Sequence, residues 1–396
     1  MFDVIHIGTS GLLNHAKGLR VVGNNLANVN TPGFKSSQLQ FANVFDQNAG
    51  SSPQFDRSGN PAQTGSGLAS LGSQVNFRAG LSQGTGNPLD LAIDGNGFFA
   101  VKRGEALLYT RSGDFGFNDQ GILVNAAGDH VQGMDAGGRL SDITLAGMAR
   151  NPAKATAVVK FAGELSTTVA TPPIDTSVAG ITILDANGAD HPVTLSFHND
   201  GAGAYNITVK DAANATVATG LIRFAAGAPV AGEDALTFSY APAGMAASDV
   251  KLDFSALVNL PSSAVPIRAL SGDGYAAGVK TDQSIGADGV LTVQYSNGQS
   301  ATGARLALAD FVTEASLAEA GGSAFRLAEG ATVNYGYAGT GGLGKLTPGR
   351  REGSNVDLAE EFGNLILMQR GYQASSHVIS TANDMIQQLF EMKGNR

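Results

Sequence analysis

The C-terminal end of the chain repeats apolar side chains every seven residues. One series consists of Leu358, Leu365, Tyr372, Ile379 and Ile386. A second series, offset by three residues, consists of Met368, Ser375, Ala382 and Leu389. Two such series over four repeats are typical of the a and d positions of a coiled-coil helix. Ser354, with Asp357 three residues on, predicts a capping box at its start, and Gly394 predicts its end.

This predicted helix is apolar on more than one side. Between Phe362 and Asn383 the only charged residue is Arg370. A helix that is apolar on several faces has to be covered on several faces, so a single partner helix is not sufficient. The additional apolar residues are Val378, Met385 and Met392 at g positions and Phe362 and Phe390 at e positions.

The N-terminal residues carry a matching pattern. Its two heptad series are Ile5, Leu12, Leu19, Leu26 and Gly8, His15, Val22, Val29. Gly11 and Gly18 lie beside this seam and would let another helix approach closely, although each costs roughly 1 kcal/mol of helix propensity relative to Ala. We therefore predict two paired helices, over residues 1–30 and 354–396. An ordinary helical bundle would also produce these patterns, but the surplus apolar faces favour burial by other copies of the chain.

The region between the helices reads as β structure. Short runs alternate apolar and polar residues between Gly, Asn and Asp turns. The fold class predicted is mainly β, with two barrel-like or sandwich-like β domains inserted between coiled-coil-forming terminal helices. The strands expected are 89–93, 98–101, 115–117, 122–124, 181–184, 193–197, 205–209, 236–240, 290–295 and 305–311, with 94–97 turning the first into the second.

Composition and pattern together predict the domain boundaries. Residues 31–75 are rich in Ser, Gly, Asn and Gln and are expected to form an extended connector without regular structure. The first β domain is expected over 76–144 and 265–353, and a separate middle β domain over 145–264. Residues 1–30 and 354–396 form the terminal helices.

Charge and cysteine content exclude several classes of function. The net charge of -9 argues against nucleic acid, which requires a basic face. The absence of cysteine excludes disulfides, thiolate metal sites and thiol nucleophiles. Residues 1–6 lack the features of a Sec-type signal, and no apolar run approaches the 18 residues of a membrane-spanning helix, so no membrane insertion is expected.

Candidate chemistry is weak. Residues 339–345, Gly-Thr-Gly-Gly-Leu-Gly-Lys, satisfy two phosphate-loop patterns. However, no helix is expected before Ser354, and Leu346 occupies the position of the magnesium-binding hydroxyl. The six histidines show no i, i+4 pair, and His191 and His198 lie seven apart on one strand, hence on opposite faces. We expect no catalytic residue, no metal and no cofactor.

Two motifs flank the β-rich region. The first is Asn24-Asn25-Leu26-Ala27-Asn28-Val29-Asn30-Thr31-Pro32-Gly33-Phe34-Lys35, in which Pro32-Gly33 ends the helix. The second is Ser354-Asn355-Val356-Asp357-Leu358, followed by Gln369-Arg370-Gly371-Tyr372-Gln373. These motifs resemble the N- and C-terminal signatures of the axial proteins of the bacterial flagellum, which comprise rod, hook and hook-associated proteins. Residues 89–99, Leu-Asp-Leu-Ala-Ile-Asp-Gly-Asn-Gly-Phe-Phe, resemble the first β domain of hook and distal-rod proteins.

The resemblance implies an extracellular structural subunit of the flagellar hook. In this family the terminal helices line the inner tube of a helical polymer, the connector touches neighbouring subunits, and hook subunits carry an extra outer domain. The hook is a curved tube that transmits motor torque to the filament as a flexible joint. The implied partners are other copies of the chain, the rod, the hook cap, the hook–filament junction proteins and the export apparatus. A distal rod or hook-associated protein is the nearest alternative.

The resemblance and the heptads together define the candidate site. The helix residues expected to mediate assembly are Ile5, Leu12, Leu19, Val22, Leu26, Leu358, Leu365, Met368, Tyr372, Ile379, Met385, Ile386 and Leu389. The signature residues are Asn24, Asn25, Asn28, Thr31, Pro32, Gly33, Phe34, Lys35, Ser354, Asn355, Val356 and Asp357. A secreted β-rich enzyme or adhesin remains the rival from another class, although an adhesin would need neither the paired heptads nor the Asn-Thr-Pro-Gly-Phe-Lys motif.

Overall fold

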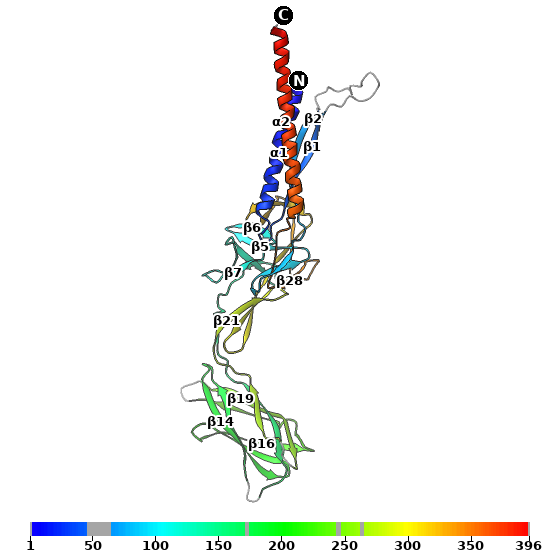
Figure 1. The fold of residues 1–396 in the computed structure, drawn as a ribbon. Helices are drawn as coiled ribbons and strands as arrows, with labels where there is room; N and C mark the ends of the chain where they lie inside the picture. Colours follow the sequence, from blue (N-terminus) through cyan, green and yellow to red (C-terminus); the bar gives the residue numbers. More distant parts are fainter. Residues whose placement is uncertain (1, 46–64, 171–173, 243–246, 262–264, 395–396) are drawn as a thin grey trace. The chain divides into compact units, whose positions relative to one another are not determined.

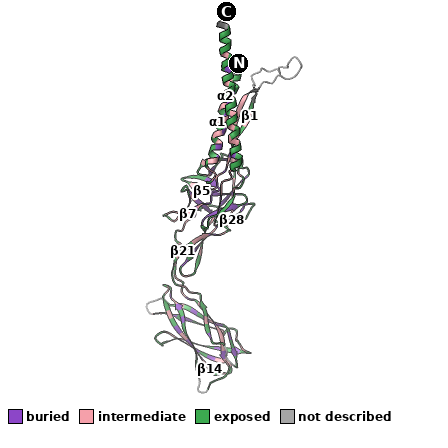
Figure 2. Ribbon diagram, in the orientation of Figure 1, coloured by how far each residue is buried: buried purple, intermediate pink, exposed green. Residues whose placement is uncertain are grey.

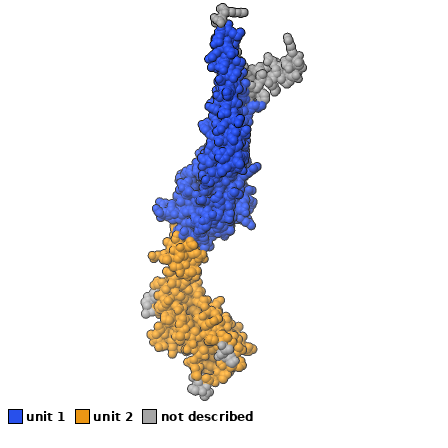
Figure 3. Space-filling view, viewed as in Figure 1, with its two compact units in different colours: residues 1–145, 283–292, 302–396 blue, residues 146–282, 293–301 orange. Residues whose placement is uncertain are grey.

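The computed structural model describes residues 2–45, 65–170, 174–242, 247–261 and 265–394 (Figure 1). The chain divides into two compact units (Figure 3). The first unit contains residues 1–145, 283–292 and 302–396, and the second contains residues 146–282 and 293–301. The described residues form a mainly β protein with one long helix near each end, which confirms the predicted fold class. None of the described helices is long and apolar enough to cross a membrane.

The two terminal helices pair in antiparallel fashion. Helix α1 spans Phe2–Ala27 and helix α2 spans Leu358–Gly394. Gly8 lies against Ile379, whereas Gly18 lies against Met368. Residue numbers therefore increase along α1 in the direction in which they decrease along α2. Figure 1 shows the C-terminal end of α2 continuing past the beginning of α1.

The start of α2 differs from the predicted capping box. The side chain of Asp357 accepts hydrogen bonds from the backbone N–H groups of Ala359 (2.8 Å) and Glu360 (3.2 Å), so Asp357 is the N-cap. Ser354 instead accepts from the backbone N–H of Val356, one turn too early to cap the helix. The predicted helix start at Ser354 is therefore wrong by four residues.

Part of the expected connector is a β-hairpin. Strands β1 (Ser37–Phe45) and β2 (Gly65–Val75) pair antiparallel, so the expectation of a segment without regular structure is wrong for these residues. Residues 46–64 lie outside the described residues. The hairpin packs on α1, where Asn14 donates to the carbonyl of Leu68 and Ser10 accepts from the N–H of the same residue. Polar helix side chains thus complete hydrogen bonds that the composition alone could not predict.

The rest of the first unit consists of short strands from the early and the late part of the chain. Its early strands are β3 (Ser82–Gly84), β4 (Leu91–Asp94), β5 (Phe98–Arg103), β6 (Ala106–Thr110), β7 (Phe115–Phe117), β8 (Leu123–Asn125), β9 (His130–Met134) and β10 (Leu140–Asp142). Its late elements are β23 (Ser300–Leu306), β24 (Leu308–Phe311), the 3₁₀ turn η1 (Glu314–Ser316), β25 (Leu317–Gly321), β26 (Ala324–Leu327), β27 (Val333–Gly336), β28 (Lys345–Pro348) and β29 (Arg350–Glu352).

Late strands pair with both sides of a group of early strands, which explains how distant segments meet. Strand β5 pairs with β6, β9 and β24, and β6 pairs with β26. The turn at 94–97 leads from β4 into β5 as predicted, but the two strands do not form a hairpin, because β4 pairs with β28. Expected residues 305–311 also divide between two strands, β23 and β24. Aromatic rings fill the core, with Phe98, Phe311 and Tyr109 in edge-to-face contact.

The second unit contains a β-sandwich. One sheet has the order β13–β14–β15–β16–β17, and the other has the order β18–β19–β12–β20. Its strands are β11 (Arg150–Asn151), β12 (Val158–Ser166), β13 (Thr176–Leu184), β14 (Asp190–Gly201), β15 (Ala204–Lys210), β16 (Thr216–Ala225), β17 (Ala228–Pro229), β18 (Ala235–Tyr240), β19 (Ser248–Leu260) and β20 (Arg268–Gly272). Strands β21 (Gly278–Ile285) and β22 (Val290–Tyr295) each have residues in both units. Phe161, Phe197 and Phe254 lie at the centre of the sandwich core.

The return boundary of the middle domain differs from the expected position at 264/265. Strand β20 pairs antiparallel with β12, and the side chain of Ile267 lies in the sandwich core. Residues 265–282 therefore belong to the second unit. The sequence did not reveal this because β20 is a mostly exposed edge strand without a clear alternating pattern.

Candidate functional site at the paired termini

The seam between α1 and α2 is built on glycines. A Cβ atom added to Gly8 would lie 2.6 Å from Cγ1 of Ile379, and one added to Gly18 would lie 2.6 Å from Sδ of Met368. On α2, a Cβ at Gly371 would lie 2.4 Å from the His15 ring. Real Cβ atoms do not approach so closely, so the two backbones meet where one side chain is missing.

The predicted helix residues occupy two kinds of place. Val22 is buried, and the half-buried positions are Ile5, Leu12, Leu19, Leu26, Leu365, Met368, Ile379 and Ile386. Four predicted residues are exposed, namely Leu358, Tyr372, Met385 and Leu389. On α1 the buried positions are Gly8, Gly11, Asn14, Gly18, Val22 and Asn25. The tightest packing thus involves small and polar residues rather than the leucine series.

Much of α2 is exposed in the single chain (Figure 2), and many of its exposed residues are apolar. The exposed apolar residues are Val4, Ile7 and Leu13 on α1, and Leu358, Phe362, Ile366, Leu367, Tyr372, Val378, Met385, Leu389, Phe390 and Met392 on α2. So many exposed apolar side chains on one helix pair indicate a surface that another molecule covers. We refer to these thirteen residues as the exposed helix surface.

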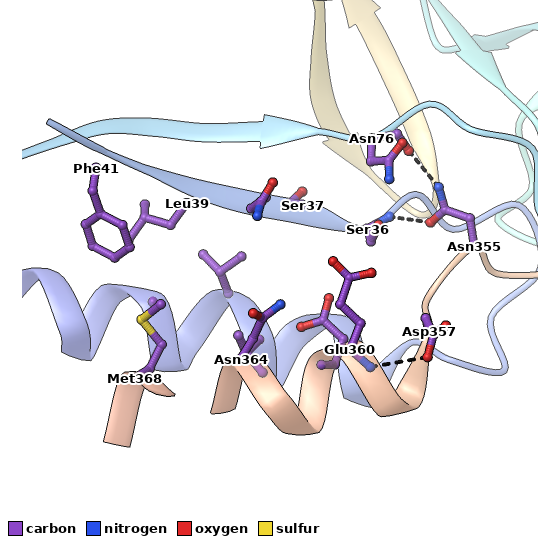
Figure 4. Close-up of a pocket in the computed structure, with 15 residues that line it drawn as sticks. Ser36, Ser37, Leu39, Phe41, Asn76, Asn355, Asp357, Glu360, Asn364 and Met368 are labelled. Carbon is purple, nitrogen blue, oxygen red and sulfur yellow. Dashed lines mark hydrogen bonds between the residues drawn. The ribbon is translucent and has the colours of Figure 1, made fainter. Parts of the chain in front are cut away.

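The two signature motifs meet at the base of the helices. The N–H of Gly33 donates to the carbonyl of Glu352 at 2.8 Å, and the N–H of Asn355 donates to the carbonyl of Phe34 at 3.3 Å. The side chain of Asn355 accepts from the N–H of Ser36 and donates to the carbonyl of Asn76 at 2.7 Å each. Asn355 therefore joins three segments that are far apart in the sequence (Figure 4).

Asn25 performs a similar function inside the helix pair. Its side chain is buried and both accepts from and donates to the backbone of Ser37, at the beginning of β1. The same amide group donates to Oε1 of Glu361 on α2 at 2.7 Å. One amide thus links α1, α2 and the hairpin, which explains why a polar residue occupies a buried seam position.

A buried ion pair lies beside these contacts. The Nζ atom of Lys35 is 2.6 Å from Oε1 of Glu352, and both side chains are almost fully buried. Lys35 also donates to the carbonyl of Arg78, and Glu352 accepts from the N–H of Gly80. Burial lowers the pKa of the Lys35 ammonium, while Glu352 acts in the opposite direction. Arg111 adds a second cation, with Nη1 3.5 Å from Oε2 of Glu352.

The remaining signature residues shape the turn after α1. Thr31 donates from its hydroxyl to Oδ1 of Asn28, whose amide group donates to the carbonyl of Asn24. Gly33 has a φ of 65°, and a Cβ there would lie 2.3 Å from the backbone nitrogen of Ser112. Only glycine fits this position. Pro32, Phe34, Ser354 and Val356 are half-buried around it, and Asp357 is exposed.

Sequence reasoning missed the partners that these residues bind. Glu352, Arg111 and Glu361 are all buried, yet none belongs to a recognisable motif. One feature of the sequence could have revealed Glu361. It is an acidic residue in the first turn of the predicted helix, at a heptad position that belongs to the seam, where an acid needs a polar partner. For Glu352 and Arg111, nothing local distinguished them from surface residues.

A pocket opens where α1, α2 and β1 meet (Figure 4). Its volume is about 270 Å³, and its lining includes Asp357, Glu360, Glu361, Asn364 and Met368 of α2. Glu361 is 8% exposed, and its Oε2 atom has no hydrogen-bond partner among the described residues. Burial raises the pKa of the Glu361 carboxyl group, with the hydrogen bond from Asn25 acting in the opposite direction.

Other candidate chemistry finds no assembled site in the part of the chain that is described. No group of three or more His, Asp or Glu side chains is arranged to hold a metal ion there. The Gly-rich run at 339–344 closes on itself through a hydrogen bond from the N–H of Gly339 to the carbonyl of Gly344, and strand β28 follows it. His191 and His198 each bind a different aspartate, Asp185 and Asp175.

Comparison with protein families matches three segments. Residues 5–35 match the flagella basal body rod protein family, residues 92–169 match the D1 domain of the flagellar hook protein FlgE/F/G family, and residues 347–392 match the C-terminal family of the flagellar basal body rod proteins FlgEFG. The first and third segments contain the two motifs that meet at the helix base. The helix pair and both motifs therefore lie in matched segments, whereas Ser37 and Asn76, which they bind, lie between the first two matches.

Individual relatives cover the whole chain. The flagellar hook protein FlgE of Borreliella burgdorferi is 30% identical, over 99% of this chain and all of that protein. FlgE of Escherichia coli is 30% identical, over 97% of this chain and 98% of that protein. A solved structure of Helicobacter pylori flagellar hook protein FlgE2 aligns with a TM-score of 0.48 at 11% identity, covering 67% of this chain and 98% of that one. From the full-length identity to the first two, we conclude that this chain belongs to the flagellar hook protein FlgE family.

Proposed function

We propose that this chain is a structural subunit of the bacterial flagellar hook, outside the cell, and that it polymerises with other copies of itself. The observation that carries the proposal is the exposed helix surface on a chain whose whole length matches hook proteins. A monomer in water would expose these side chains at a cost of about 25 cal/mol for each Å² of apolar area. Packing between copies removes that cost.

The helix pair would supply the inner tube of the polymer. Glycine packing at Gly8, Gly11 and Gly18 brings α1 and α2 close together within one subunit, which leaves the exposed helix surface for neighbouring subunits. The polar linkage through Asn25, Asn355 and Lys35 ties this pair to the β-rich part of the same unit. In this mechanism torque passes from copy to copy through the helices while the β regions remake polar contacts with their neighbours as the tube bends.

The partners beyond the polymer follow from the family relationship. We assign the rod, the hook cap, the hook–filament junction proteins and the export apparatus as partners. We assign no catalytic activity, because the exposed helix surface and the buried polar junction both serve packing rather than the binding of a substrate. The β-sandwich of the second unit is assigned to the contacts between neighbours that change during bending, and it is not required for the tube itself.

Electron microscopy of the purified full-length protein tests the proposal. Concentrated protein should form tubes, whereas a fragment of residues 31–357, which lacks both helices, should stay monomeric with its β structure intact by circular dichroism. A variant lacking residues 146–282 serves as the matched deletion and should still form tubes. Tubes formed equally well by the 31–357 fragment would contradict the assignment of the helices.

A further inference from the structure

Arg370 is an isolated charge on the exposed helix surface. It is the only charged residue between Phe362 and Asn383, and the exposed residues Ile366 and Leu367 lie in the preceding turn. Within the described part of the chain Arg370 forms no ion pair. Covering this surface with another subunit would bury the guanidinium, and an unpaired buried charge costs several kcal/mol. An arginine in this position therefore requires an acidic partner.

The pocket at the start of α2 contains an acid with one unpaired oxygen. Oε2 of Glu361 is buried without a hydrogen-bond partner among the described residues, in a pocket that Glu360 and Asn364 also line (Figure 4). Leaving a buried carboxylate oxygen unpaired is unfavourable. Glu360 adds a second carboxylate, whereas the carboxylate of Asp357 is already used to cap the helix.

Arg370 cannot form an ion pair with Glu360 or Glu361 of its own chain. Glu360 and Arg370 are ten residues apart on a single continuous helix, which separates them by roughly 15 Å along its axis. The other exposed arginine of the helix pair, Arg20, lies on α1 next to the exposed polar residues Lys17 and Asn24, where water can solvate it. Arg370 is thus an exposed cation beside apolar residues, and Glu361 is a buried acid whose Oε2 atom has no hydrogen-bond partner among the described residues.

We propose that Arg370 of one copy enters the Glu360–Glu361 pocket of a neighbouring copy in the polymer. This inference rests on the proposed function, since it names one contact of the assembled hook. The guanidinium carries five N–H donors in a rigid fork, enough to bind Oε2 of Glu361, the carboxylate of Glu360 and the amide oxygen of Asn364 together. Because the two patches differ, each copy can offer its arginine to one neighbour and its pocket to another. Such a head-to-tail contact produces an open helical array.

Introduced cysteines test the contact directly. The chain has no cysteine, so a double variant, Glu360→Cys with Arg370→Cys, contains only the designed pair. A disulfide requires Cα atoms within about 7 Å, closer than an extended arginine bound to a glutamate holds them, so a short bismaleimide is used to join the two thiols. It is too short to span the roughly 15 Å between the two positions within one chain. Tubes treated with it should give a ladder of dimers, trimers and longer species on denaturing gels, whereas each single variant can give dimers at most. The matched control is Glu360→Cys with Ser376→Cys, which places the second thiol on another exposed side of α2 and should give no ladder.

A charge exchange provides a second measurement in case the cysteine variants do not assemble. Arg370→Glu should reduce the pelleted polymer by about tenfold or more, since a contact weakened by about 1.4 kcal/mol is already tenfold weaker. Combining it with Glu360→Arg should restore most of the polymer, because complementary charges then meet across the contact. Tubes that form without a ladder, or a double variant no better than the single one, would overturn this inference and leave the proposed function intact. Failure of the unaltered protein to form tubes would instead contradict the proposed function.

Discussion

The Lys35–Glu352 ion pair joins the two ends of the chain at the scale of single residues. The two residues are 317 positions apart, and their side chains are almost completely buried. A buried pair adds little net stability over an apolar replacement of both residues, but removal of one partner leaves a charge without compensation. We infer that this pair fixes the register between the segment after α1 and the segment before α2.

Lys35→Met should therefore be strongly destabilising. We expect the free energy of unfolding of the first unit to fall by about 3–5 kcal/mol, because Glu352 would remain buried with its Oε1 atom unpaired by a cation and only Arg111, 3.5 Å from Oε2, to compensate its charge. Urea unfolding of the full-length monomer, followed by circular dichroism, measures this loss. The matched control is Lys102→Met, which removes a partly exposed lysine paired with Glu105 and should change stability by less than about 1 kcal/mol. Equal effects of the two variants would show that the buried pair has no special role.

The sequence reveals the two motifs of this junction but not the residues that they bind. The motif around Pro32-Gly33 and the Ser354–Asp357 motif were both recognised, and the structure brings them into contact. The residues that bind them were not recognised, since Glu352, Arg111 and Asn76 become partners only when strands from the two ends of the chain pair. Short-range patterns report helix ends and turns, but they carry no information about which distant acid meets a buried lysine.

At the scale of the elements, glycines determine how closely α1 and α2 approach. Gly8 is buried against Ile379, whereas a Cβ added to Gly23 on the same helix would meet no heavy atom within 4 Å. The heptad pattern predicted both helices and their pairing correctly. It also placed Gly8 in the seam and predicted close approach at Gly11 and Gly18, which the structure confirms. The leucine series that it placed in the seam is only half-buried, because polar Asn14 and Asn25 are buried against the hairpin instead.

Two glycine-to-alanine variants of α1 should have opposite effects. Gly23→Ala should stabilise the monomer by up to about 1 kcal/mol, because alanine is the better helix former. Gly8→Ala should destabilise it by about 1 kcal/mol, because the displacement of Ile379 outweighs the same gain in propensity. Thermal unfolding followed at the helix band of the circular dichroism spectrum compares the two. Stabilisation by both variants would mean that the close approach of the helices contributes nothing.

The β-sandwich of the second unit should fold by itself when β20 is included. A fragment of residues 146–282 contains both sheets and should unfold cooperatively on heating. A fragment of residues 146–264 lacks β20 and the buried Ile267, and we expect it to lose several kcal/mol of stability. Calorimetry of the two fragments measures the difference. Indistinguishable melting temperatures would show that β20 is only loosely attached.

For the whole molecule, α2 carries both residues that pack within the chain and apolar residues that stay exposed. Ile379 is half-buried against Gly8 of the same chain, whereas Met385 is 43% exposed. Both residues belong to one continuous apolar pattern, so the sequence alone assigned them to assembly together. That the g-side residues Val378, Met385 and Met392 meet another subunit remains a prediction, motivated by their exposure.

A glutamate at Met385 and a glutamate at Ile379 should block assembly at different stages. Met385→Glu should leave the stability of the monomer within about 0.5 kcal/mol of the unaltered protein, as expected of a surface change. It should nevertheless abolish polymer, since every contact would bury an unpaired charge. Ile379→Glu should also lower the helix signal of the monomer. Sedimentation under polymerising conditions, with circular dichroism of the monomer, separates the two stages, and normal polymer from Met385→Glu would refute the assembly role of this face.

The antiparallel pairing of α1 with α2 also sets the order of folding in time. The two helices are separated by the whole β-rich region, so α1 can pack on the β1–β2 hairpin early but lacks its partner helix until the last residues of the chain are available. Closure of so long a loop is slow, and it follows the local pairing of hairpins. The helix pair is thus completed last in a chain that is made from its N-terminus. A chain that stops before Leu358 lacks α2 and with it most of the exposed helix surface, and we expect such a chain to be left out of the polymer.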